Sequence, residues 1–240
     1  MNINKSAFVQ FLNSIILKGD IESKEAVLKV SKNDIKVITK TNNNVLALRA
    51  VLKGNFEDIG EIGIGDLGLL RNFITSFDSE ELQLTKTKNK LVLKSETEKV
   101  EIQSNIVNPE YIKIKVPEDK FDGLVKQSLG YELVLTLDTI KKIIGYSSTI
   151  KAQDIILTGK GKNLTLQLDE LDSKIVASFE LTEEAKEFKI KFQASYLINL
   201  LSQVKQETII SPHTNKGMYV KVENEAYIIE YMIAPIEIKE

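Results

Sequence analysis

The sequence predicts an α+β fold made of two copies of one unit, and three observations support this. Short runs that alternate apolar and polar residues, typical of strands, fill most of the 240 residues. Four helix-like runs interrupt these strands in two pairs. The second half of the chain also repeats the first, because residues 62–73 match residues 190–201 at an offset of 128. The sequence therefore predicts a duplicated unit of helix, strands, helix, strands.

Each element of the unit has its own signal. Apolar residues recur at helical spacing in four runs, which are 5–19, 66–77, 137–148 and 195–204. In the second run, Asp66 is the expected N-cap. Everything between the helices is expected to be strand and turn, including a hairpin whose turn lies at Lys88 to Lys90. The helix near the start of each copy matches at an offset of 132, which allows for a difference in loop length.

The glycines of "GIGDLG" have the spacing G-x-G-x-x-G that dinucleotide-binding enzymes use. Such a site also needs a parallel strand after the helix, but an antiparallel hairpin pattern follows here. The equivalent turn in the second copy, "KFQASY", contains no glycine. We therefore expect Gly63 and Gly65 to permit close packing or a bulge in a strand. An oxidoreductase that uses this turn is the less favoured alternative.

Composition narrows the function classes. The chain has no cysteine and one histidine, so thiolate metal sites, cysteine nucleophiles and a Ser-His-Asp triad have little support. His213 is expected in a surface turn. The formal net charge of −2 does not indicate nucleic-acid binding. Any such binding must come from an uneven distribution of charge over the surface. With no long apolar run and no signal-peptide pattern, we expect a cytoplasmic protein without membrane contact.

Taken in order, these segments resemble a sliding DNA clamp, the ring-shaped processivity factor of replicative polymerases. The resemblance rests on "KSAFVQFLNSI", "VLALRAVLKG" and "IGIGDLGLLRNFITSF" in the first half and on "LVLTLDTIKKIIGYSSTIKAQDIILTGKGKNLTLQL" in the second. The end, "YMIAPIEIKE", is similar to the tail of cellular clamps. The chain is most similar to clamps of T4-type bacteriophages and more distantly to eukaryotic and archaeal clamps. Because the basic central segment of cellular clamps is absent, a viral origin is favoured.

The resemblance implies a protein that encircles duplex DNA without sequence specificity and tethers the replicative DNA polymerase. It would not be an enzyme and would need no cofactor or metal. A separate clamp loader ATPase would place it on DNA. Two domains per chain, 1–105 and 129–240 joined by a connector at 106–128, imply a homotrimeric ring. In each domain, two helices would line the inner face and antiparallel sheets would lie outside.

The resemblance also implies where subunits meet. The strand at 99–105 would pair with an edge strand of the next subunit, for which 173–181 is the candidate because its alternation otherwise leaves an open edge. The expected interface residues are Val100, Ile102, Ile175 and Ala177. The alternative is that both edges are paired within one chain.

DNA would contact basic residues on the inner helices, with acidic runs left on the outer surface. The expected DNA-facing residues are Lys5, Lys18, Arg71, Lys141, Lys142, Lys151 and Lys205. Lysines on exposed helix faces also occur on any solvated surface, so each one separately has this second explanation.

Partner peptides would insert beneath the connector, into a pocket that anchors apolar side chains. The residues that match this pocket by position are Val45, Leu46, Ile112, Ile114, Val116, Met232, Ala234, Pro235 and Ile236. Apolar connector residues can instead simply pack on the sheets. For the whole chain, two more hypotheses stay open: a duplicated β-rich viral structural or assembly protein, and a clamp subunit of a mixed checkpoint-type ring.

Overall fold

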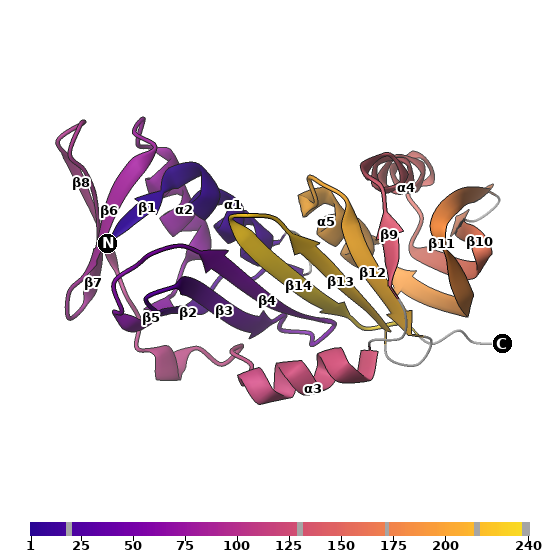
Figure 1. Cartoon of the computed structure of the whole chain (residues 1–240), viewed down its shortest axis with the longest axis horizontal. Helices are drawn as coiled ribbons and strands as arrows, with labels where there is room; N and C mark the ends of the chain where they lie inside the picture. The colour runs from indigo at the N-terminus through magenta and orange to yellow at the C-terminus, as the bar shows by residue number, and fades with distance from the viewer. Residues whose placement is uncertain (18–20, 129–131, 171–172, 214–216, 237–240) are drawn as a thin grey trace. The chain divides into compact units, whose positions relative to one another are not determined.

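The computed structural model describes residues 1–17, 21–128, 132–170, 173–213 and 217–236 (Figure 1). The chain divides into two compact units. Unit 1 consists of Met1–Leu17, Glu22–Glu118 and Glu223–Ile229, and unit 2 consists mainly of Asp119–Val222 and residues 230–236. The expected connector, 106–128, is therefore divided between the two units.

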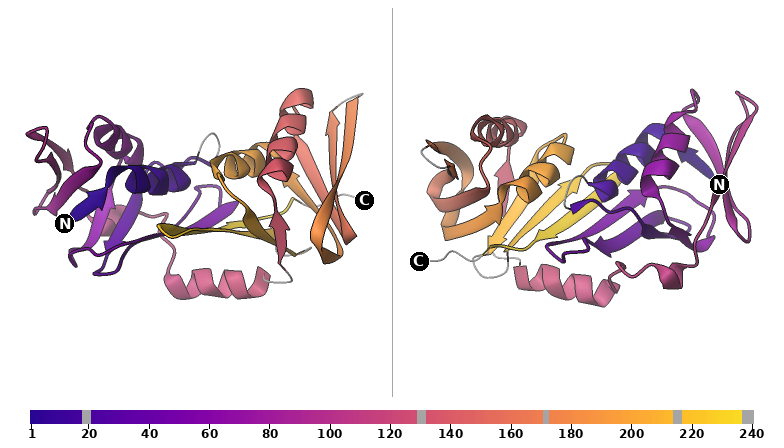
Figure 2. Two further views of the ribbon diagram at one scale, coloured as in Figure 1. Left: turned by 45° about the horizontal axis from the view of Figure 1, so that its top comes forward. Right: turned by 180° about the vertical axis from the view of Figure 1, so that it is seen from behind.

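Two helices of unit 1, α1 (Lys5–Ile16) and α2 (Leu67–Thr75), lie side by side over its sheets (Figure 2). Side chains cap both helices at their first turns, as the sequence predicts for Asp66, whose carboxylate accepts from the Leu69 N–H at 2.7 Å. The Asn4 side chain caps α1 in the same way. The buried face of α1 carries Phe8 and Phe11, which stack with their ring centroids 5.9 Å apart.

The strands of unit 1 form two antiparallel groups. In the first, the order is β5 (Gly60–Ile64), β2 (Ala26–Val30), β3 (Asp34–Lys40) and β4 (Leu46–Lys53). In the second, the order is β1 (Asn2–Asn4), β6 (Glu81–Lys86), β7 (Lys90–Ser95) and β8 (Val100–Asn105). Alternate residues of β3 and β4 are buried, so one face of the first group packs into the core and the other faces solvent.

Unit 2 contains the second pair of core helices. Its elements are β9 (Leu133–Leu135), α4 (Leu137–Ile150), β10 (Asp154–Glu170), β11 (Ser173–Gln193), α5 (Ala194–Gln203), β12 (Thr208–His213) and β13 (Gly217–Glu223). The last strand, β14 (Tyr227–Ile233), contributes its first three residues to unit 1 and the others to unit 2.

Strand pairing confirms the duplication. In unit 2, β9, β12 and β13 are neighbours in that order, which repeats β1, β6 and β7 of unit 1. The long hairpin of β10 and β11 pairs 154–159 with 188–193, as β2 pairs with β5. The same hairpin pairs 163–170 with 173–180, as β3 pairs with β4. The predicted α+β fold of two duplicated units is therefore correct.

The prediction of only strand and turn between the four helices is wrong. Residues 118–128 form an additional helix, α3 (Glu118–Ser128), after a 3₁₀ turn, η2 (Pro109–Tyr111). Phe121, Leu124 and Val125 follow helical spacing, and Phe121 is fully buried. The connector has no counterpart in the repeat, so the comparison of the two halves could not reveal this helix. His213 is also not in a turn, because it is the last residue of β12 and is half-buried.

The glycines of "GIGDLG" serve packing, as the sequence predicts. Gly63 lies in β5, and its carbonyl accepts a hydrogen bond from the Val107 N–H at 2.9 Å. A Cβ atom at Gly63 would overlap the Val107 carbonyl oxygen, and one at Gly65 would press on the Val107 side chain. The missing side chains therefore let the chain cross the edge strand β5 as it enters the connector. Close packing therefore explains the glycine motif that suggested an oxidoreductase.

Candidate functional site

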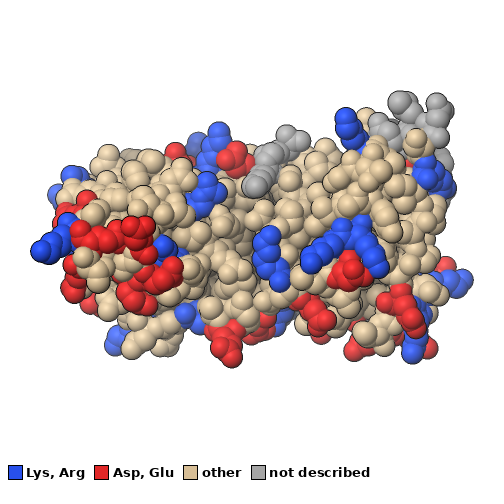
Figure 3. All heavy atoms as spheres, turned by 90° about the horizontal axis from the view of Figure 1, so that it is seen from above, with Lys and Arg blue, Asp and Glu red and all other residues tan. Residues whose placement is uncertain are grey.

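Charge is distributed unevenly between the four core helices and the rest of the chain. α1, α2, α4 and α5 contain four basic residues and one acidic residue. The whole chain contains 32 basic and 34 acidic residues, so the remainder has 28 and 33. Figure 3 shows one face of the molecule, on which basic side chains stand in separate groups with acidic ones among them. The helices are thus weakly cationic in an acidic protein.

Lys5, an expected DNA contact, binds to groups within unit 1. Its ammonium donates to the Phe77 carbonyl at 2.9 Å and to the Asp78 carbonyl at 3.3 Å, and it lies 3.5 Å from a Glu80 carboxylate oxygen. These carbonyls follow α2 directly, so a cation here also interacts favourably with the helix dipole. Lys5 therefore joins the start of α1 to the end of α2.

The Glu80 carboxylate faces the same junction. The Ser6 hydroxyl donates to it at 2.8 Å and the Ser6 N–H at 3.3 Å. The hydroxyl bond is the main reason that the pKa of Glu80 lies below its usual value, and the charge of Lys5 adds a smaller effect. The carboxylate is thus held ionised beside the first turn of α1.

Arg71 and Lys142 also have partners on their own helices or the adjacent one. The Arg71 guanidinium donates to Asn13 at 3.4 Å and to Asn72 at 3.1 Å, and the side chain is half-buried. The Lys142 ammonium lies 2.7 Å from the Asp138 carboxylate, one turn earlier on α4. A hydrogen bond to Asp138 and the charge of this carboxylate raise the pKa of Lys142. Both residues stay partly accessible to an anion.

Besides Lys142, three more of the expected DNA-facing lysines are exposed. Lys141 lies on α4, Lys151 follows its last turn in a left-handed conformation, and Lys205 follows α5. The Lys205 ammonium approaches the Ser202 carbonyl at 3.5 Å, the outer limit for a hydrogen bond. Among the expected DNA-facing residues that the structure describes, these three lysines have no ion pair and are the most available for phosphate contacts. Lys18, the seventh residue of the prediction, lies outside the described residues.

The expected interface strands lie at edges of the described sheets. β8 ends its four-stranded group, and β11 pairs only with β10 among the described strands. Val100 on β8 is 41% exposed, and Ile102 is half-buried. On β11, Ile175 and Ala177 are half-buried, while Val176 on the opposite face is 58% exposed. The sequence prediction omitted Val176, although the alternation of the strand places it beside the two predicted residues.

The residues of the expected peptide pocket fall in both units. In unit 1, Leu46, Ile112 and Ile114 are buried, and Val45 and Val116 are half-buried. In unit 2, Met232 is buried, Pro235 is half-buried and Ala234 is exposed. Ile236 is 38% exposed, and its N–H donates to the Lys191 carbonyl at 2.8 Å. In unit 1, Ile112 and Val116 line the same groove. The C-terminal residues of the set, 232 and 234–236, belong to unit 2.

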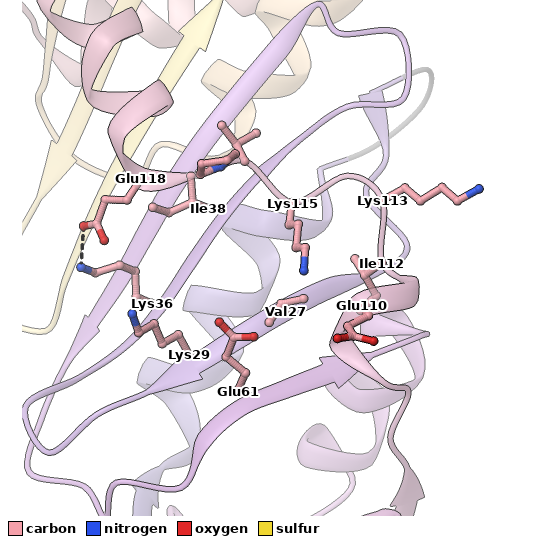
Figure 4. Close-up of a pocket in the computed structure, with 12 residues that line it drawn as sticks. Val27, Lys29, Lys36, Ile38, Glu61, Glu110, Ile112, Lys113, Lys115 and Glu118 are labelled. Carbon is pink, nitrogen blue, oxygen red and sulfur yellow. Dashed lines mark hydrogen bonds and ion pairs between the residues drawn. The ribbon is translucent and has the colours of Figure 1, made fainter.

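Unit 1 has a groove between its outer sheet face and the connector. Its cavity volume is about 550 Å³, within the range of ligand sites. Strands β2, β3 and β5, the turn η2 and the segment that leads to α3 line it (Figure 4). The lining residues are Val27, Lys29, Lys36, Ile38, Glu61, Glu110, Ile112, Lys113, Lys115, Val116, Pro117 and Glu118. Only Ile112 and Val116 were expected from the sequence, because the sheet residues have ordinary strand alternation and no distinguishing motif.

The described residues contain no group of three or more His, Asp or Glu side chains that could hold a metal ion. Within the same residues, every helix is too short or too polar to span a membrane.

Comparisons with known proteins identify the fold. No protein-family model matches the sequence, and no curated protein matches it. The structure is similar to the proliferating cellular nuclear antigen (PCNA) of Entamoeba histolytica, with a TM-score of 0.79, 16% identity and coverage of 98% of this chain and 96% of that chain. It is also similar to PCNA of A. fulgidus, solved with the C-terminal region of FEN-1, with a TM-score of 0.80, 16% identity and coverage of 100% and 98%.

A bacterial protein shares the fold as well. The DNA polymerase sliding clamp of Caulobacter crescentus gives a TM-score of 0.75 at 14% identity, covering 99% of this chain and 65% of the bacterial chain. This chain therefore corresponds to about two thirds of the bacterial clamp and to almost the whole of each PCNA chain. The chain has the sliding-clamp fold.

Proposed function

We propose that the chain is a sliding clamp that encircles duplex DNA and tethers the replicative DNA polymerase. The observation that carries this proposal is the sliding-clamp fold over at least 98% of the chain, together with the duplication that the strand pairing shows. A fold alone supports many functions, so the surfaces must also suit this one. Neither a dinucleotide-binding enzyme nor a virion component accounts for the fold and the charge distribution together.

The open strand edges support a closed ring of three chains. An edge strand with exposed apolar residues tends to pair with another chain. The two edges, β8 and β11, are different surfaces, so their pairing is head-to-tail, and a three-fold rotation closes it. Val100 and Ile102 of one subunit would meet Ile175, Val176 and Ala177 of the next. The domain limits 1–105 and 129–240 and the connector 106–128 belong to this proposal.

The weakly cationic helices support DNA in the lumen. A topological link needs no tight grip, and few phosphate contacts let a ring slide. Lys141, Lys151 and Lys205 are exposed enough to make such contacts. Arg71 and Lys142 can contact a phosphate while they keep their bonds to Asn13 and Asp138. The excess of acidic residues elsewhere would repel DNA from the outer surface.

The proposal extends to partners that the fold suggests. The FEN-1 tail bound to A. fulgidus PCNA supports peptide capture by a clamp of this fold. In this chain, unit 1 would supply Val45, Leu46 and the connector residues Ile112, Ile114 and Val116 to such a pocket. The proposed clamp performs no catalytic step, needs no cofactor, and is loaded by a separate ATPase in the cytoplasm. A source among T4-type bacteriophages is part of the proposal and rests only on the sequence resemblance.

Light scattering after size exclusion tests the ring, at several protein concentrations. The proposal predicts a mass of three times 27.0 kDa that falls toward one chain on dilution. A single chain at every concentration would contradict the homotrimer. In that case a mixed ring with another subunit becomes the account to test.

A further inference from the structure

The groove of unit 1 lies where two neighbouring strands separate. β2 and β3 pair only at Lys29 with Lys36 and Val30 with Ile35. Beyond this point β2 continues along β5 while β3 continues along β4, so the two strands diverge. We call this opening the fork, bounded by residues 26–28 of β2, residues 38–40 of β3 and residues 114–116 of the connector.

The connector occupies one side of the fork. The Lys40 N–H donates to the Ile114 carbonyl at 3.0 Å, and the Val116 N–H donates to the Ile38 carbonyl at 3.1 Å. Thr39 and Lys115 form the antiparallel bridge between these bonds. In a continuous hairpin, Ile38 would pair with Val27. The connector has therefore taken the position on β3 that β2 leaves.

Strand alternation determines which backbone N–H and C=O groups point into the fork from each side. Ser31 and Asp34 close the hairpin with a backbone hydrogen bond, so Lys29 and then Val27 direct their N–H and C=O groups to the same side of β2. Because Ile114 and Val116 bond to β3, Lys115 directs its own N–H and C=O away from β3. The backbone groups of Val27 and Lys115 thus face the fork, and among the described residues no other backbone group bonds to them across it.

The side chains around the fork offer apolar contact and a positive charge, that of Lys115, which extends over the opening. Val27, Ile38, Ile112 and Val116 supply the apolar lining. The Lys36 ammonium is paired with Glu118 at 2.8 Å, and Lys29 lies directly across from Glu61 on the adjacent strand. Figure 4 shows the Lys115 side chain extending over the groove toward Val27, while that of Lys113 points away. Neither Lys115 nor Lys29 has an ion pair in the described part of the chain.

We propose that the fork binds an extended peptide segment with alternating apolar and acidic side chains, as an added β-strand. Its backbone would bond to Val27 on one side and Lys115 on the other, which is strand addition with two edges instead of one. Its apolar side chains would cover the lining, and an acidic side chain would pair with Lys115. The fork lies entirely in unit 1 and uses no C-terminal residue. It therefore differs from the peptide pocket above, although both include Ile112 and Val116, and it is independent of ring formation.

The test uses the full chain, labelled with ¹⁵N, and a seven-residue peptide that alternates valine and glutamate with blocked ends. Amide hydrogen exchange is followed by NMR with and without saturating peptide. The proposal predicts that exchange at the Val27 and Lys115 amides slows by about tenfold or more on binding. Unchanged exchange at both amides under saturation would overturn it, as would no binding at about 1 mM peptide.

Matched reagents separate strand addition from charge attraction. A peptide with N-methylated amides along one edge keeps its charges but cannot donate hydrogen bonds there, and it should bind about tenfold more weakly. Lys115→Glu should weaken the parent peptide roughly fivefold to tenfold, and Lys113→Glu by less than about twofold. Equal binding of the N-methylated peptide, or equal effects of the two variants, would overturn the proposal. Both lysines are exposed, and a thermal melt of each variant confirms folding.

Failure of this test would not count against the clamp proposal, because the peptide-binding experiment involves neither the ring nor DNA. Conversely, a chain that stays monomeric can still bind the peptide in unit 1. The two proposals therefore fail independently.

Discussion

The Lys36 ammonium lies 2.8 Å from the Glu118 carboxylate, which ties β3 to the residue at which α3 begins. The Lys36 side chain is 25% exposed and that of Glu118 is 47% exposed. Solvent therefore screens the pair, and the backbone bonds of Ile114 and Val116 hold the connector more firmly. This relationship places the connector against unit 1 without making the ion pair essential.

Removing the ion pair should cost little. Glu118→Gln is expected to lower the free energy of unfolding by less than about 1 kcal/mol, because exposed pairs seldom contribute more. Urea unfolding at low and high salt measures this, and the difference from the parent chain should shrink at high salt. A loss above about 2 kcal/mol would show that the pair is effectively buried.

Gly63→Ala should destabilise unit 1 by about 1–3 kcal/mol, because the new methyl group overlaps a backbone carbonyl that cannot rotate away. Gly145→Ala is the matched control, since it lies inside α4 with open space around its Cβ position. That control should stabilise by about 0.5–1 kcal/mol. Thermal or urea unfolding compares the two, and equal effects would refute the close approach of Val107.

A new charge at the β11 edge should open the ring. Val176→Asp places a carboxylate in the proposed interface, where it would lose water without a partner, so the trimer should dissociate at concentrations that keep the parent assembled. The thermal stability of the single chain should stay nearly constant because Val176 is 58% exposed. Leu124→Asp on α3, at 42% exposure, is the control and should leave the mass unchanged. An unchanged mass for Val176→Asp would exclude this edge.

The lysines should separate into structural and DNA-binding groups. Lys141→Gln combined with Lys151→Gln and Lys205→Gln should weaken DNA binding and reduce the log–log salt slope by about 0.9 for each phosphate that the chain no longer neutralises. Lys5→Met should instead lower stability while leaving the salt slope unchanged, because its ammonium is occupied by the Phe77 and Asp78 carbonyls. The reverse result would place Lys5 at the DNA.

The Ser6–Glu80 bond should make stability depend on pH. The folded-state pKa of Glu80 lies below its unfolded value, chiefly because Ser6 donates to the carboxylate. This contribution is present above the unfolded pKa, near 4.5, and is lost as pH falls through the folded pKa. Ser6→Ala should therefore destabilise the chain at pH 7 and much less at about pH 3. A constant difference between these pH values would rule out the linkage.

The duplicated fold could be predicted because its signal is repeated. Two amphipathic helices and the strand hairpins occur in the same order in each half of the chain, so each copy supports the interpretation of the other. The helix α3 occurs once, in a segment without a counterpart, so its apolar spacing has no second copy to support it. The groove was only partly predicted, since Ile112 and Val116 belong to the connector, whereas the strand residues beside them carry no distinguishing pattern.

The roles of single charged residues could not be predicted from the sequence. Lys5 and Lys141 both lie on amphipathic helices, but only the folded chain brings Lys5 to the end of α2. Likewise, the separation of β2 from β3 depends on where the connector bonds, which is a contact across more than 70 residues. Long-range backbone pairing of this kind leaves no local pattern.

Threading onto linear DNA tests the central claim most directly. A duplex fixed at one end to a surface is offered with its other end open or blocked by a bulky protein, and the retained chain is measured. The account predicts accumulation on open-ended DNA at concentrations that sustain the trimer, and release when the duplex is cut near the surface. Equal retention on open and blocked DNA would show ordinary surface binding and contradict a ring that encircles the duplex.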